Sequence, residues 1–172
     1  MKNFDLSPSL KYCAFFGVLL LAACKNNNAQ LTTAENAMIK DGVTRMAANI
    51  SKDLSAKGPA AWIDYFENNP GFFMASGGTL AFEDYATAKT YTLDTVAKKF
   101  NNISLSWKNI TVDPLTATYA SMGADFHEDL VLANGQNLWV GGYFTATAHF
   151  DGSRWRLRNM NWATKAAAKP VR

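Results

Sequence analysis

The chain has 172 residues, of which 48% are hydrophobic, and its formal net charge is +3 at pH 7. This composition is typical of a globular domain with a core of its own, because disordered chains are poorer in apolar residues and more highly charged. The basic residues are dispersed along the sequence, so the charge does not indicate a nucleic acid as partner, which would require a clustered basic surface.

The N-terminus has the pattern of a secretory signal peptide. Lys2 and Lys11 precede an apolar run from Tyr12 to Ala23, which is shorter than the about 20 residues of a membrane-spanning helix. The residues Leu21-Ala22-Ala23-Cys24 resemble the lipobox of bacterial lipoproteins. The resemblance implies that Cys24 receives a diacylglyceryl group and palmitate and becomes the first residue after cleavage. We therefore expect a protein of the bacterial cell envelope, anchored to a lipid bilayer on the periplasmic or outer-membrane side.

This interpretation divides the chain into four parts. They are the signal peptide (1–23), the lipidated cysteine with a flexible polar tether (24–31), a single domain (32–165) and a tail (166–172). Cys13 leaves with the signal, so the domain is expected to contain no disulfide and no thiolate ligand. Its histidines, His127 and His149, lack metal-ligand spacing, and we expect neither a metal site nor another cofactor.

Helical signals dominate the first part of the domain. Thr32 and Glu35 have the spacing of a capping box, and apolar residues then recur at helical spacing over about five turns. Gly58-Pro59 starts a second, short helix, and Asp84 is placed to cap a third. Two short strands around Gly77-Gly78 are expected between the second and third helices.

From Ile103 the apolar period changes to two, which indicates β-strands. A first strand with a bulge before Ile110 is followed by three longer ones, at about residues 118–132, 137–150 and 154–164. Asn134-Gly135 and Asp151-Gly152 are hairpin signals between them. This order predicts an α+β domain in which one curved antiparallel sheet of about four to six strands wraps around three helices.

Three features of the sequence resemble the nuclear transport factor 2-like superfamily, which includes ketosteroid isomerases and SnoaL-like polyketide cyclases. They are the order of the elements, the Trp107 strand that leads into ITVDP, and the ending HFDGSRWRLRNMNWAT. Family members often carry His and Ser near this end, where Asn161 and Ala163 stand here. The resemblance implies a cone-shaped fold with a pocket between the helices and the concave sheet, commonly in a homodimer.

Alternation along the last strands assigns side chains to the two faces of the sheet. The stripe of Trp155 and Leu157 continues to Asn159 and Asn161, so these amides are expected on the core face, with Gly142 leaving space beside Asn161. Space and a polar group in apolar surroundings favour a site for a small apolar molecule. The predicted pocket residues are Trp62, Phe66, Phe73, Trp107, Phe126, Phe144, Asn159 and Asn161. Alternatively, both amides bond to backbone at a sheet edge.

The opposite face is expected to carry large aromatic residues, Trp139, Tyr143 and Trp162, which favour a dimer interface there. Matching this face across the hairpin at Asn134-Gly135 requires a loop of odd length or a bulge.

Asp125 and His127 are two residues apart, so they share one strand face and could orient a general base; a salt-bridged surface pair is the alternative. Glu128 and Asp129 are expected to be solvated charges on opposite faces. The carboxylate base of a ketosteroid isomerase would be expected near Phe72 to Ser76, where no acidic residue stands.

These residues support three hypotheses. The first is non-catalytic binding of a small apolar molecule in the cone, since the amide of Asn161 cannot transfer a proton near neutral pH. The second is an isomerase, cyclase or dehydratase that uses Asp125 and His127. The third is a protein-interaction module of the cell envelope.

Overall fold

The computed structural model of the protein describes residues 30–165, and one compact unit begins at Leu31. The predicted signal peptide, the predicted lipidation site at Cys24 and the tail from residue 166 lie outside the described residues. Among residues 30–165, no helix combines the length and the apolar character needed to cross a membrane.

The long helix α2 (Thr33–Lys57) begins at the predicted capping box. The Thr32 hydroxyl accepts a hydrogen bond from the Glu35 N–H (3.2 Å), and the Glu35 carboxylate accepts one from the Thr32 N–H (2.7 Å). These two bonds satisfy backbone donors that have no partner inside the first turn. The buried face of α2 consists of Ile39, Val43, Met46, Ala47, Ile50 and Leu54.

The other helices are short. The predicted second helix is a 3-10 helix, η2 (Pro59–Asp64). The third begins at Asp84, whose carboxylate accepts a hydrogen bond from the Thr87 N–H (2.7 Å). It runs from α3 (Tyr85–Tyr91) through a π-helical turn, η3 (Thr92–Val96), into α4 (Ala97–Lys99).

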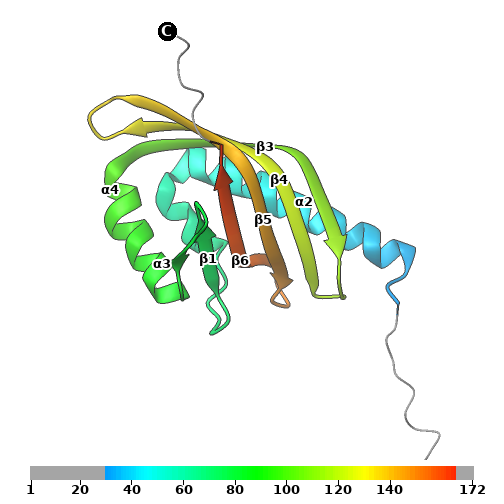
Figure 1. The fold of residues 1–172 in the computed structure, drawn as a ribbon. Helices are drawn as coiled ribbons and strands as arrows, with labels where there is room; N and C mark the ends of the chain where they lie inside the picture. The colour runs from blue at the N-terminus through cyan, green and yellow to red at the C-terminus, as the bar shows by residue number, and fades with distance from the viewer. Residues whose placement is uncertain (1–29, 166–172) are drawn as a thin grey trace, which may run out of the picture. The chain divides into compact units, whose positions relative to one another are not determined.

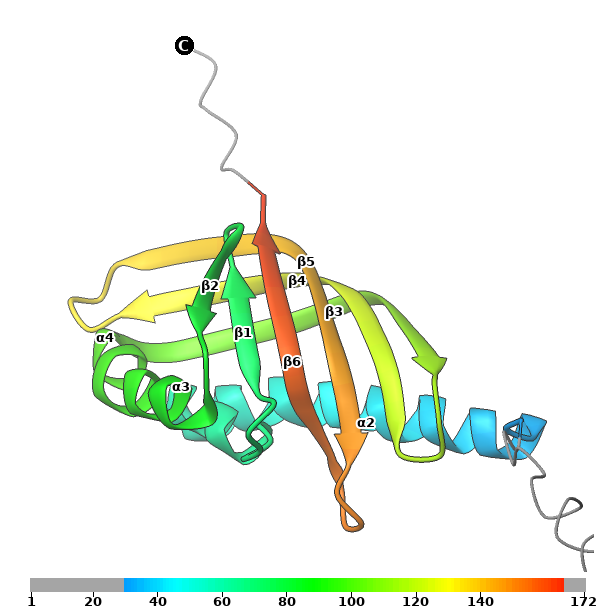
Figure 2. The ribbon, with the colours of Figure 1, turned by 60° about the horizontal axis from the view of Figure 1, so that its bottom comes forward.

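The six strands form one sheet in the order β2-β1-β6-β5-β4-β3. The strands are β1 (Phe73–Ser76), β2 (Thr79–Phe82), β3 (Phe100–Pro114), β4 (Tyr119–Leu132), β5 (Asn137–Phe150) and β6 (Trp155–Thr164). The sheet is mixed, whereas an antiparallel sheet was predicted, because β1 runs parallel to β6. The sheet curves over α2 (Figure 1), and β1, β6 and β5 pass in front of that helix in Figure 2. The α+β class and the wrapped sheet are confirmed.

The predicted faces of β4 and β5 are confirmed. Phe126 and Phe144 are buried on the core side, together with the small residues that alternate with outward-facing ones. At the intervening hairpin, the Leu132 N–H donates to the Gln136 carbonyl (2.9 Å), which leaves a three-residue loop ending in Gly135 at a φ of +83°. The loop therefore has the odd length that the matching of faces requires.

β6 departs from the predicted alternation. Ala148 pairs with Leu157 but Thr147 pairs with Asn159, so Arg158 is an extra residue in a β-bulge. Leu157 and Met160 are consequently both buried, at 0% and 2% exposure. Beyond the bulge every side chain lies on the face opposite to the one predicted. The prediction that put Asn159 and Asn161 on the core face and Trp162 on the outer face is therefore wrong.

Candidate functional site

Aromatic side chains pack together on the inner side of the sheet. The Trp162 ring lies 4.5 Å from that of Phe144 and 4.6 Å from that of Phe126, measured between centroids. It also packs against Trp62 (5.6 Å) and Trp107 (5.9 Å). Trp107 is anchored in turn, because its indole N–H donates to the Ala47 carbonyl of α2 (3.0 Å). We call these rings the inner aromatic cluster.

Five of the predicted pocket residues thus lie between the helices and the sheet. Trp62, Phe66, Phe126 and Phe144 are buried and Trp107 is half-buried. Trp162, predicted for the dimer face, lies among them because of the bulge in β6. The protein's own indole ring therefore occupies space beneath the sheet where a pocket was expected.

Gly142 does not leave space beside Asn161. It pairs with Thr164, while Asn161 pairs with Thr145. A Cβ atom at position 142 would collide with the Ala163 carbonyl oxygen and would lie 2.9 Å from the Phe126 ring. The glycine is needed for close packing of β5 against β6, and that part of the prediction is wrong.

Glu128 lies on the inner face of β4, between Leu105 of β3 and Val140 of β5. Its side chain is half-buried, and it forms no hydrogen bond or ion pair with another residue of the described domain. Burial among apolar neighbours raises the pKa of Glu128 from its ordinary value to about 7. The prediction of a solvated charge is wrong, and the carboxyl group can gain or lose a proton near neutral pH.

Asp125 and His127 share the outer face of β4, as predicted, but the structure does not bring them together. Asp125 accepts a hydrogen bond from the Asn109 side chain (2.8 Å), and the His127 Nε2 lies 3.2 Å from an Asp129 oxygen. The His127 ring stacks on Trp139 with centroids 5.7 Å apart. Both predicted catalytic groups therefore lie outside the cone, and His127 is paired to a different carboxylate.

An open groove of about 510 Å³ crosses the outer face of the sheet. Phe73, Asn159 and Asn161 line it, so these three predicted pocket residues do come together, but on the opposite face of the sheet from the inner aromatic cluster. Phe73 pairs with Asn159 and points outward because its neighbour Phe72 takes the buried position. The other residues on this face that line it are Thr111, Asp113, Ser121, Gly123, Tyr143, Thr145 and Thr147. We call this surface the outer groove.

The two amides of the outer groove differ in their bonding. The Asn159 side-chain amide donates to the Gly71 carbonyl (2.7 Å), which agrees with the alternative of a backbone partner. Asn161 forms no side-chain hydrogen bond within residues 30–165. Its donor and acceptor are therefore open to solvent or to a ligand.

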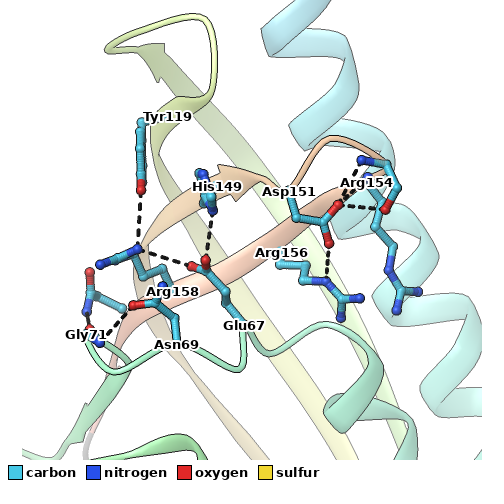
Figure 3. A network of polar contacts seen from close by, with 11 residues as sticks. Glu67, Asn69, Gly71, Tyr119, His149, Asp151, Arg154, Arg156 and Arg158 are labelled. Atoms are coloured by element: carbon cyan, nitrogen blue, oxygen red, sulfur yellow. Dashed lines mark hydrogen bonds and ion pairs between the residues drawn. The ribbon is translucent and has the colours of Figure 1, made fainter.

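A polar network beside the outer groove was missed by sequence reasoning (Figure 3). The buried carboxylate of Glu67 lies 2.8 Å from the His149 Nδ1 and 3.7 Å from the Arg158 guanidinium. Arg158 also donates to the Tyr119 hydroxyl (3.2 Å), and the Tyr119 ring stacks on His149 at 4.3 Å. The network anchors the segment before β1 to the sheet. No sequence period could reveal it, because Arg158 is the bulge residue.

Trp139 and Tyr143 are exposed on the outer face, as predicted, at 62% and 43%. Their role in a dimer stays a prediction. Among residues 30–165, no three His, Cys, Asp or Glu side chains gather as metal ligands would.

No protein-family model and no curated protein matches this sequence. Solved structures do. A scytalone dehydratase-like protein from Novosphingobium aromaticivorans gives a TM-score of 0.68 at 17% identity, covering 82% of this chain and 94% of that one. A nuclear transport factor 2-like superfamily protein from Salmonella enterica gives 0.59 at 17% identity, over 81% and 97%. Hexachlorocyclohexane dehydrochlorinase LinA-type3 from Novosphingobium barchaimii gives 0.63 at 8% identity, over 78% and 92%. Such identities show the fold alone: the chain has the nuclear transport factor 2-like fold.

Proposed function

We propose that the protein is a lipid-anchored lipoprotein of the bacterial cell envelope whose nuclear transport factor 2-like domain binds a ligand without converting it. The main support for binding without catalysis is the position of Trp162 within the inner aromatic cluster. An apolar molecule in the cone, as first predicted, would have to displace that ring. The predicted catalytic pair, Asp125 and His127, lies on the other side of the sheet.

The lipid anchor is supported by the sequence. The charged N-terminal region, the short apolar run and the LAAC ending at Cys24 agree with one another. Several acyl chains on one cysteine hold a domain on a bilayer far more firmly than a single chain does.

Glu128 favours a second candidate function. A carboxyl group that titrates near neutral pH on the apolar inner face is suited to general acid–base catalysis. Two of the similar structures are named as a dehydratase and a dehydrochlorinase. In this alternative the enzyme would use Glu128 in place of the predicted Asp125 and His127.

Native mass spectrometry of the protein purified from membranes distinguishes the two functions. A binding module is expected to retain the same ligand mass in the wild type, in His127→Ala and in Glu128→Gln. An enzyme that eliminates water or hydrogen chloride, as the names of these two similar structures suggest, would instead accumulate an unconverted molecule of different mass in the variant that lacks its acid–base group. The same spectra report whether the predicted homodimer forms. A difference in retained mass between the wild type and Glu128→Gln would refute the non-catalytic proposal.

Replacing Cys24 with serine is expected to release the protein from the membrane, because a hydroxyl group cannot receive the thioether-linked lipid. The measurement is the distribution between membrane and soluble fractions, together with the intact mass. Cys13→Ser is the matched control and is expected to stay membrane-bound. Equal membrane binding of the two variants would contradict acylation at Cys24.

A further inference from the structure

The outer groove offers neutral polar groups whose hydrogen bonds are not used inside the domain. Within residues 30–165, the side chains of Ser121, Thr145, Thr147 and Asn161 donate to and accept from no other residue. Thr145 lies between Gly123 and Asn161 in the register, and Thr147 lies between Ser121 and Asn159. Hydroxyl and amide groups therefore stand side by side across three strands. Such a surface matches a ligand that carries many hydroxyl groups of its own.

Tyr143 adds a flat aromatic surface at one end of these groups. A Cβ atom at Gly123 would lie 2.5 Å from the Tyr143 hydroxyl oxygen and 3.2 Å from the ring carbon that bears it. The ring therefore lies across the neighbouring strand, and it can do so only because position 123 has no side chain. At 43% exposure, much of the ring is in contact with solvent. An exposed ring held in this way can stack on the C–H face of a sugar ring.

The charge of the lining restricts the ligand further. Among the described residues that line the outer groove, Asp113 is the only charged one. Its carboxylate repels anionic groups, and it can accept hydrogen bonds from hydroxyl groups. The nearby cation Arg158 is already paired with Glu67 and Tyr119. Neutral ligands are therefore favoured over acidic ones.

We propose that the outer groove binds a neutral oligosaccharide, with one sugar ring stacked on Tyr143 and its hydroxyl groups bonded to Asn161 and the neighbouring threonines. This inference rests on the proposed function of the domain as a binding module and names the site and the class of ligand. A pocket volume of about 510 Å³ lies within the range of sites for small molecules.

Binding of trisaccharides to the full chain tests the proposal. The protein is expressed with its signal, purified as processed in a detergent without a sugar headgroup, and titrated with maltotriose and triacetylchitotriose by calorimetry and ligand-observed NMR. Trigalacturonate is the acidic comparison. At least one neutral trisaccharide is expected to bind, and trigalacturonate is expected to bind more weakly. In Asp113→Asn this difference between neutral and acidic sugars is expected to shrink.

Two substitutions test the Tyr143 ring as a stacking surface in different ways. Tyr143→Ala removes the stacking surface, whereas Gly123→Ala keeps the ring but forces it off the strand. Each is expected to weaken binding of the neutral sugar about tenfold, the factor that corresponds to one lost aromatic contact. Trp139→Ala is the matched control, because Trp139 is an exposed aromatic on the same face but outside the groove. Thermal unfolding of each variant checks that it is folded.

Several results would overturn the inference. The first is that no neutral trisaccharide binds, and the second is that Trp139→Ala and Tyr143→Ala lose the same affinity for the neutral sugar. The third is a homodimer that dissociates in Tyr143→Ala, since a second copy of the chain would then occupy the groove. Retention of a different, unaltered ligand in native mass spectra would leave the proposed function intact while this inference fails. Conversely, a sugar that binds through Tyr143 and is cleaved on incubation would refute the non-catalytic function and keep the site.

Discussion

Replacing Trp162 with alanine is expected to lower the free energy of unfolding by about 3 to 5 kcal/mol, the usual cost of deleting a large aromatic side chain from a core. Its ring packs against four other aromatic rings of the inner aromatic cluster. These neighbours belong to different elements and can collapse into the vacated space only in part. Denaturant unfolding at neutral pH measures the change.

Asn161→Ala is the matched control, one residue away on the opposite face of the same strand. A surface substitution of this kind is expected to change the free energy of unfolding by no more than about 0.5 kcal/mol. If β6 lacked its bulge, Asn161 would be the inward residue and the order of the two effects would be reversed. The pair therefore tests both the packing and the register.

The Trp162→Ala variant is also expected to bind small apolar molecules that the wild type excludes. Apolar cavities of aromatic size stay free of water and accept molecules such as benzene. Indole or benzene should raise the midpoint of thermal unfolding of Trp162→Ala and leave that of the wild type unchanged. An equal response of both proteins would mean that the wild-type cone already holds an open apolar pocket, as first predicted from the sequence.

The contrast between β5 and β6 explains how much the sequence could predict. Along β5 a strict period of two holds from Gly142 to Ala148, so alternation assigns every side chain to its face. In β6 the inward-facing residues Leu157, Met160 and Trp162 are spaced by three and then by two, and the first two are buried while Trp162 is half-buried. That spacing is itself the signature of a bulge. Reading the stripe from Trp155 by strict alternation missed it.

The missed bulge in β6 affected the prediction of the site more than the prediction of the fold. The element order, the capping box of α2 and the curved sheet depend on local patterns, and these were predictable. The site depends on the register of one strand, where a single extra residue moved both asparagines to the outer groove. The parallel pairing of β1 with β6 was not predictable from local signals either, because it joins segments far apart in the sequence.

Glu128 was misjudged for a different reason. Alternation along β4 places it on the same stripe as Phe126 and Leu130, both of which are buried. Because glutamate is charged, Glu128 was expected to face solvent, but alternation along the strand indicated its position on the inner face correctly. Its position makes the stability of the whole domain depend on pH.

Glu128→Gln is expected to stabilise the domain by about 3 kcal/mol at pH 8 and to have little effect at pH 4. Both states of the wild type are protonated below the ordinary pKa of 4.5, so burial of the carboxyl group carries no ionisation cost there. Between pH 4.5 and about 7 the unfolded chain ionises first, and the stability of the wild type falls; above about pH 7 the loss is complete. Each unit of pKa difference corresponds to about 1.4 kcal/mol, which sets the size of the effect.

The measurement is the free energy of unfolding of both proteins between pH 4 and pH 8. Asp129→Asn is the matched control, because Asp129 is the neighbouring acid on the outer face and its carboxylate is exposed. This control is expected to follow the wild type across the same range. If the curve of Glu128→Gln also ran parallel to that of the wild type, the Glu128 carboxylate would be solvated in the folded protein. The physical basis for an enzymatic role would then disappear, since only a pKa raised by burial fits that group for proton transfer at neutral pH.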